Sequence, residues 1–195
     1  MLMQGIKSNP KNYIVILALS FSLSGAAPLA VQPVWADYQA SNEVIRLNNA
    51  GVSALNRQAY TEAIRLLKQA LKADPNYKMA RDNLAIAYNN YGLQLQSTPM
   101  KALAQFHKAV LLNPDNPTTK QNVEGIIRSL NRDPNKFEDR VDLGDTCRKA
   151  SDFAGAIVEY QAALSLKSDA KVWEKLGDVY RVANKLDDAV NAYET

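Results

Sequence analysis

The sequence predicts an all-α protein, a solenoid of antiparallel helix pairs with about nine helices. One observation behind this is a recurring pair of alanines seven residues apart, set among apolar residues at helical spacing. The pairs are Ala63 and Ala70, Ala102 and Ala109, and Ala156 and Ala163. The other observation is that the stretch 173–193 has the same order of residue types. Such self-similarity is typical of stacked helix pairs, in which each unit covers the apolar face of the next.

The composition fits a globular helical protein and gives no sign of a charged partner. Of the 195 residues, 47% are hydrophobic, with 8 Gly and 8 Pro, which is unlike a disordered chain. The net charge is +3, and Lys7 and Lys11 in the N-terminal segment supply two of these charges, leaving +1 elsewhere. A balance this even gives no reason to expect nucleic acid or an anionic membrane surface as the partner.

Residues 1–36 are expected to be a secretory signal peptide. Two lysines precede a short apolar run over residues 14–23, and small residues lead to Val34 and Ala36, so cleavage is expected between Ala36 and Asp37. The alternative is an uncleaved anchor over residues 14–31, which is about long enough to span a membrane. The chain is therefore expected to be exported, to the periplasm or cell envelope or by secretion.

Spacing also predicts how the array is divided. A linker over 37–43 precedes repeats at about 44–77 and 78–116, a degenerate half-repeat at 117–136, a repeat at 137–169 and an incomplete one at 170–195. Pro75 and Pro114 are 39 residues apart, five more than the usual repeat of about 34. The extra residues lie at 92–97 and predict an elongated first helix, followed by a helix that begins near Pro99.

Two helices are expected to lack the helix that would normally follow and cover them. The helix that begins at Asn116-Pro117 has a good cap and an apolar face but no second helix before the next repeat. The second helix of the last repeat stops at Thr195 with Val190 and Tyr193 uncovered, whereas solenoids normally end in a polar capping helix. We therefore expect the parent protein to continue beyond Thr195.

Little in the sequence suggests chemistry. His107 is the single histidine and is expected on an outward face, with no second ligand or general-base partner at a useful spacing. Cys147 is the single cysteine and is expected to be a small buried residue rather than a reactive thiol. No nucleophile–base pattern and no phosphate-binding glycine loop is present. The sequence therefore predicts no enzyme, no catalytic or metal site and no cofactor.

The chain resembles the tetratricopeptide-repeat superfamily from about Val44 to its end. The most specific match is Trp173-x2-Leu176-Gly177-x2-Tyr180, followed by Ala189 and Tyr193. In that pattern we expect Gly177 to admit the second helix, with Ala189 as the small residue that meets it.

The resemblance implies a right-handed superhelix whose concave surface, lined by the first helix of each pair, holds a peptide or a partner helix. The groove residues it implies are Asn48, Val52, Asn56, Asp82, Ile86, Asn89, Asn90, Val141, Asp145, Arg148, Glu174, Asp178 and Arg181.

The implied partner is a protein or peptide of unknown identity, with a membrane contacted only through an uncleaved N-terminal segment. Some members clamp a peptide carboxylate with Lys and Asn, but Asn48 and Val52 stand at those places here and Asn83 alone matches the second repeat. The Asn-rich first half instead suits hydrogen bonding along an extended backbone. Two alternatives remain: self-association through the uncovered Tyr193 end, and a binding domain of a longer protein whose activity lies beyond Thr195.

Overall fold

The structure, a computed structural model, describes residues 40–195, and the predicted signal peptide, its cleavage site and the alternative anchor lie outside this range. Nine α-helices and no strand occupy the described residues, which confirms the predicted all-α solenoid. The helices are α1 (Asn42–Asn56), α2 (Tyr60–Ala73), α3 (Lys78–Gln94), α4 (Pro99–Leu112), α5 (Pro117–Ser129), α6 (Phe137–Lys149), α7 (Phe153–Leu166), α8 (Ala170–Val182) and α9 (Leu186–Tyr193).

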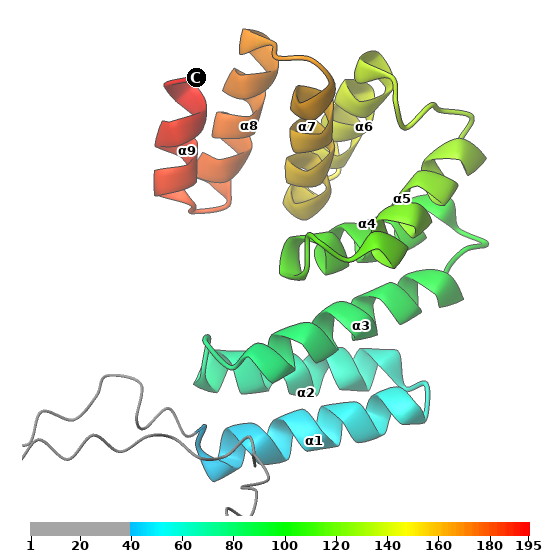
Figure 1. Ribbon diagram of the computed structural model, residues 1–195, viewed down its shortest axis with the longest axis vertical. Helices are drawn as coiled ribbons and strands as arrows, with labels where there is room; N and C mark the ends of the chain where they lie inside the picture. Colours follow the sequence, from blue (N-terminus) through cyan, green and yellow to red (C-terminus); the bar gives the residue numbers. More distant parts are fainter. Residues whose placement is uncertain (1–39) are drawn as a thin grey trace, which may run out of the picture. The chain divides into compact units, whose positions relative to one another are not determined.

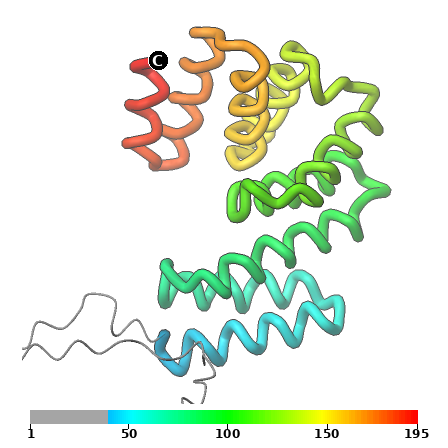
Figure 2. The backbone as a smooth tube through the Cα atoms, viewed as in Figure 1, coloured from blue at the N-terminus to red at the C-terminus, as the bar shows by residue number. Residues whose placement is uncertain are grey.

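Consecutive helices pack as pairs, and each pair packs on the next. The pairs are α1 with α2, α3 with α4, α6 with α7 and α8 with α9, and Figure 1 shows the two members of each running antiparallel. The second helix of one pair contacts the helix that follows it, as α2 does with α3 and α7 with α8. The backbone tube in Figure 2 follows this order in the described part of the chain, with α5 standing between the second and third pairs.

Four of the nine helices in residues 40–195, α1, α5, α7 and α8, begin at a residue whose side chain caps them. The Asn116 side chain accepts a hydrogen bond from the backbone N–H of Thr119 at 3.0 Å, and Pro117 occupies the first turn of α5, as predicted. Asp169 caps α8 in the same way, with its Oδ1 accepting from the backbone N–H groups of residues 171 and 172. The 17 residues of α3 are the elongated first helix that the sequence predicted, and α4 begins at Pro99.

A glycine in the first helix of every pair faces a large side chain of the second helix. A Cβ on Gly144 would lie 2.5 Å from the Tyr160 ring, a distance at which one of the two groups must move. The absence of that Cβ lets α6 and α7 approach closely enough for the Tyr160 ring to be buried. The four facing pairs are Gly51 with Leu67, Gly92 with Phe106, Gly144 with Tyr160 and Gly177 with Tyr193.

This packing differs from the expectation at two places. The side chain opposite Gly177 is the Tyr193 ring, not Ala189, although Ala189 is buried nearby. In the second pair Gly92 meets Phe106, whereas the spacing from Pro75 predicts Ala85 at the place where the other first helices have their glycine. The glycine lies farther along α3 because this helix is longer, so the close approach to α4 falls near its C-terminal end.

The core divides into three apolar clusters along the array. One lies among α1, α2 and α3 around Leu67, and a second joins α4, α5 and α6 around Phe106, Ile127 and Leu143. The third lies among α6 to α9 around Tyr160. Between the second and third clusters the array departs from a regular succession of pairs, and the features described next are located there.

Candidate functional site at the junction of α4 and α7

The junction is the place where a second helix is missing. Only residues 130–136 connect the end of α5 to the start of α6, so α5 has no antiparallel partner following it. The second helix of the third repeat, α7, packs directly against α4. Two second helices that belong to different repeats therefore meet at this point, and α5 contacts α4 beside them.

A buried polar network holds this contact together. His107 of α4 and Glu159 of α7 are both fully buried, and His107 Nε2 lies 2.6 Å from Glu159 Oε1. Arg140 of α6, 8% exposed, donates from its guanidinium to Glu159 Oε2 at 2.9 Å and to the Pro134 carbonyl at 2.8 Å. One carboxylate thus receives hydrogen bonds from two helices besides its own.

The charge of Glu159 is maintained in spite of its burial. Burial alone raises the pKa of a carboxyl group, but the hydrogen bond to His107 and the hydrogen bond and positive charge of Arg140 outweigh it here. The pKa of Glu159 is therefore held below its usual value, and the group is a carboxylate at neutral pH. Such a network fixes geometry, because each partner is satisfied in only one arrangement of the three helices.

The expected outward position of His107 is wrong. Its side chain is 0% exposed and has a carboxylate partner 52 residues away in the sequence. The reason is that α4 is covered on two sides, by α3 through Phe106 and by α7 through His107. The four-residue spacing from buried Leu103 to His107 is the signal that the sequence offered.

Cys147 is buried, as predicted, at 2% exposure. Desolvation, together with the negative charges of Asp152 and Glu159, raises the pKa of its thiol to about 12, so it is protonated at neutral pH and not a nucleophile. Within residues 40–195 one group of side chains has metal-binding atoms close together: those of His107, Cys147 and Asp152 all lie within 4.8 Å of one another.

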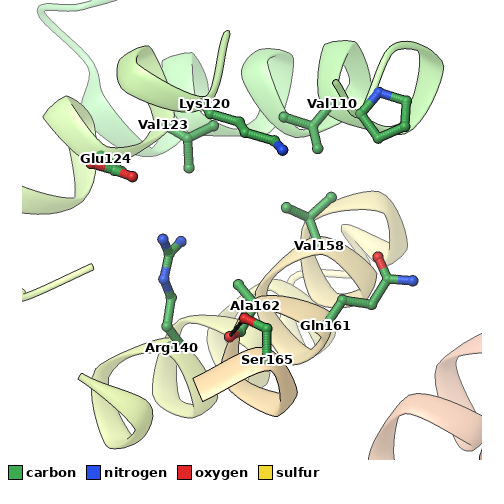
Figure 3. A pocket seen from close by; sticks show the side chains of 10 residues that line it. Val110, Lys120, Val123, Glu124, Arg140, Val158, Gln161, Ala162 and Ser165 are labelled. Carbon is green, nitrogen blue, oxygen red and sulfur yellow. Dashed lines mark hydrogen bonds between the residues drawn. The ribbon is translucent and has the colours of Figure 1, made fainter. Parts of the chain in front are cut away.

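A pocket of about 360 Å³ opens beside the buried network, between α4 and α5 on one side and α6 and α7 on the other. In Figure 3 the Arg140 guanidinium and the Lys120 ammonium extend toward the space between the two groups of helices. Its apolar lining comes from Val110, Val123 and Val158.

Glu124 also lines the pocket but is paired with Arg128 at 2.9 Å, and Arg140 is paired with Glu159 at 2.9 Å, so Lys120 is the charged lining residue without an ion pair in residues 40–195.

The residues predicted to line a concave groove fall into two groups, and the first is engaged in bonds between first helices. Asn48 is 1% exposed, and its Oδ1 accepts a hydrogen bond from Asn83 Nδ2 at 2.9 Å, which links α1 to α3. Asn89 Oδ1 accepts from Asn122 Nδ2 at 2.8 Å and from the Thr119 hydroxyl at 3.4 Å, which links α3 to α5. These amides therefore join first helices of neighbouring repeats.

In the second half of the array, the aspartates among the predicted groove residues accept hydrogen bonds from neighbouring helices. Asp145 accepts hydrogen bonds from Lys175 Nζ at 2.7 Å and from the Tyr160 hydroxyl at 2.6 Å, so it connects α6 with α8 and α7. These contacts outweigh desolvation and hold the pKa of Asp145 below its usual value. Asp178 accepts from the Tyr193 hydroxyl at 2.9 Å, which connects α8 to α9.

The second group faces solvent to a larger extent. Ile86 is 47% exposed, and Asn56, Arg148, Glu174 and Arg181 are exposed as well. Partly exposed members of the predicted set are Val52, Asp82 and Asn90, as is Val141. Arg148, Asp178 and Arg181 line one small pocket of about 250 Å³ between α6 and α8. Three of the predicted groove residues thus border one pocket, and the use of the set by a partner stays a prediction.

Within the part of the chain that the structure describes, no helix has the length and apolar character needed to cross a membrane.

Comparison with known proteins bears on the second half of the chain. Residues 141–195 match the family model described as tetratricopeptide repeat. No curated protein matches the sequence.

Solved structures of MamA resemble the chain at low identity. A MamA structure from AMB-1 has 19% identity over 77% of this chain and 88% of that one, with a TM-score of 0.33. A MamA structure from Desulfovibrio magneticus RS-1, which begins at its residue 41, has 17% identity over 80% of this chain and 94% of that one, with a TM-score of 0.34. Scores at this level carry no information about what the present chain binds.

Proposed function

We propose that the chain is a tetratricopeptide-repeat protein, as the match of residues 141–195 supports, and that it is a non-catalytic scaffold that binds a segment of a partner protein in the pocket between α4–α5 and α6–α7. The observation that carries the proposal is the missing second helix after α5, beside which this pocket lies. A partner segment bound there contacts two repeats at once, as binding segments of helical-repeat proteins do.

The lining of the pocket defines the kind of segment that fits. Valines on both sides provide an apolar lining, and Lys120 provides a positive charge that is not neutralised by an ion pair within residues 40–195. Arg140 also lines the pocket, but its guanidinium is already bonded to Glu159 and to the Pro134 carbonyl, so a ligand carboxylate would pair with Lys120. The favoured occupant is a short segment that presents an apolar side chain next to a carboxylate.

The polar face of the first helices is a less favourable binding site than the pocket. Several of its amides and carboxylates already hydrogen-bond neighbouring helices, and a partner that used them would have to replace those bonds without net gain. The exposed residues Ile86, Arg148 and Arg181 remain available on that face and form the competing site in the experiment below.

The experiment is capture of partners with the full chain as bait, followed by titration of the captured protein. The pocket variant is Lys120→Glu, the first-helix variant is Arg181→Glu, and the matched control is Lys68→Glu, the same charge reversal on the exposed part of α2. We expect Lys120→Glu to weaken binding at least about tenfold, the factor that corresponds to about 1.4 kcal/mol. Loss of binding in Arg181→Glu alone would move the site to the first helices.

We also propose that the protein acts outside the cytoplasm, on the strength of its N-terminal segment. The expected mature chain begins at Asp37, and the intact mass of the protein isolated from its host measures this directly. A mass that includes residues 1–36, with the protein in the membrane fraction, would favour the uncleaved anchor over residues 14–31.

A second candidate function is self-association through α9. Leu186, Val190 and Tyr193 lie on one stripe of this helix and are 59%, 53% and 47% exposed. If two copies pair through this stripe, the sedimentation mass rises with concentration and Val190→Glu abolishes the rise. A constant monomer mass would exclude this candidate.

A further inference from the structure

Three potential metal ligands converge at the place where α4, α6 and α7 meet. They are His107 of α4, Cys147 of α6 and Asp152, the residue that caps the start of α7. Their ligand atoms lie within 4.8 Å of one another, and two of the three side chains are buried. Nitrogen, sulfur and oxygen donors in this combination are those that Zn²⁺ takes in proteins.

The free atom of His107 points to a ligand. Nε2 is hydrogen-bonded to Glu159, but Nδ1 is buried and, in the described part of the chain, has no hydrogen-bond partner. A buried polar atom left without a partner is costly and rare in native proteins. The carboxylate behind Nε2 is the arrangement seen around metal-bound histidines, since it fixes the ring and leaves the other nitrogen free for the ion.

Gly155 leaves the space in which an ion would lie. A Cβ at this position would stand 2.8 Å from His107 Nδ1, 2.8 Å from Cys147 Sγ and 2.6 Å from Asp152 Oδ2, so all three donor atoms border the same small volume. Asp152 divides its two oxygens: Oδ1 accepts the capping hydrogen bond from the Gly155 N–H at 3.1 Å, and Oδ2 faces the cluster.

We propose that His107 Nδ1, Cys147 Sγ and Asp152 Oδ2 bind one Zn²⁺ ion. A thiol loses its proton to solvent when it binds, so the sulfur enters as thiolate. A pocket of about 380 Å³ lined by Tyr91, Met100 and Gln105 reaches Cys147 and Asp152, and it provides a route for the ion and room for a water molecule as the fourth ligand. The ion ties the second repeat, through α4, to the third, through α6 and α7.

The composition of the chain makes this site simple to test, because it contains one histidine and one cysteine. The full chain is prepared without a histidine tag, stripped with a chelator, and given ZnCl₂ or CoCl₂ in turn. We expect one zinc per chain after gel filtration and, with Co²⁺, a sulfur-to-cobalt charge-transfer band in the near ultraviolet. At a hundredfold excess over Kd, Zn²⁺ should raise Tm by roughly 5 to 10 °C.

Two variants remove a ligand while keeping the local structure. Cys147→Ala keeps a small apolar residue, and Asp152→Asn keeps the capping oxygen while removing the negative charge. We expect the first to abolish the cobalt band and each to weaken zinc binding at least about tenfold. The matched control is Asp169→Asn at the cap of α8, which makes the equivalent backbone hydrogen bonds away from the cluster and should bind zinc like the parent chain.

The proposal is overturned if the stripped chain retains no zinc after gel filtration or shows no charge-transfer band with cobalt. It is equally overturned if the two ligand variants bind zinc as tightly as Asp169→Asn, since the ion would then be held elsewhere. Far-ultraviolet circular dichroism of each stripped variant verifies that its helices are intact before the comparison is made.

Discussion

The contacts between the two helices of each pair are apolar at their centre, whereas the contact between α4 and α7 is polar and charged. Within each pair, a glycine and a large side chain meet without polar atoms at the centre of the contact, except for the ring hydroxyls at the edge. Between α4 and α7, the centre is a histidine and a glutamate with an arginine beside them, all nearly or fully buried. Both contacts are closely packed, but they specify structure differently.

The difference shows what each kind of contact can do. A contact between a glycine and a large apolar or aromatic side chain tolerates exchange between repeats, and Leu67, Phe106, Tyr160 and Tyr193 fill the same role in four pairs. A buried carboxylate with two partners tolerates one arrangement only, because a shift that breaks either bond leaves a charge unpaired. The polar junction therefore holds a defined geometry at the point where the missing helix interrupts the repeat.

The largest effect is expected from removing the carboxylate at the junction. Glu159→Ala leaves Arg140 buried without its anion, and we expect a loss of about 3–5 kcal/mol in the free energy of unfolding, measured by urea denaturation. Glu124→Ala is the control, because its ion pair with Arg128 is largely exposed and should cost less than about 1 kcal/mol. Similar small losses in both variants would mean that the junction does not depend on the network.

A smaller effect is expected from adding one methyl group inside a pair. Gly144→Ala places a Cβ against the Tyr160 ring, and we expect a loss of about 1–3 kcal/mol in the free energy of unfolding. Gly125→Ala in α5 meets no atom within 4 Å and should gain about 0.5–1 kcal/mol from helix propensity. The close approach of α6 and α7 would be disproved by a gain in both variants.

The next largest loss of stability is expected from removing the Asn48 amide, which joins α1 to α3. Asn48→Ala deprives the Asn83 amide of its acceptor in a mostly buried place, and we expect a loss of about 1–2 kcal/mol on thermal or urea unfolding. Asn56→Ala, an exposed position on the same helix, should change the free energy of unfolding by less than about 0.5 kcal/mol. If Asn48→Ala were neutral but impaired partner capture, the amide would belong to the binding surface after all.

The smallest effect is expected at the turn between α1 and α2. Gln58 adopts φ 59°, a left-handed conformation that strains a residue with a Cβ. Gln58→Gly should therefore raise the free energy of unfolding by about 0.5–1 kcal/mol. Lys68→Gly, in the interior of α2, should lower it by about 1 kcal/mol, and a loss in both variants would contradict the strain at this turn.

The sequence was sufficient for the parts of the fold that depend on local patterns. The number of helices, the elongated α3, the cap and unpaired state of α5 and the burial of Cys147 all follow from spacing, capping and composition. They follow because each depends on residues within one or two turns of each other, where helical periodicity determines what shares a face.

The parts that sequence did not predict depend on contacts across the array. His107 and Glu159 are 52 residues apart, and nothing local to either indicates that a missing helix brings α7 onto α4. Asn48 and Asn89 have the residue type and sequence position expected of groove-lining residues. Their amides instead hydrogen-bond Asn83 and Asn122 of other helices, and those contacts are not visible in the sequence. The sequence predicted that Ala189 contacts Gly177, but the side chain that lies against Gly177 is the ring of Tyr193, sixteen positions later in the chain.

The most direct test of the central claim, that a partner binds at the interruption of the array, is hydrogen–deuterium exchange of the chain with and without its captured partner. The account predicts slower exchange on binding in residues 110–124 and 158–165, which border the pocket between α4–α5 and α6–α7. Protection confined to α8 and α9, or to the exposed face of α1 and α3, with the pocket unchanged, would contradict it.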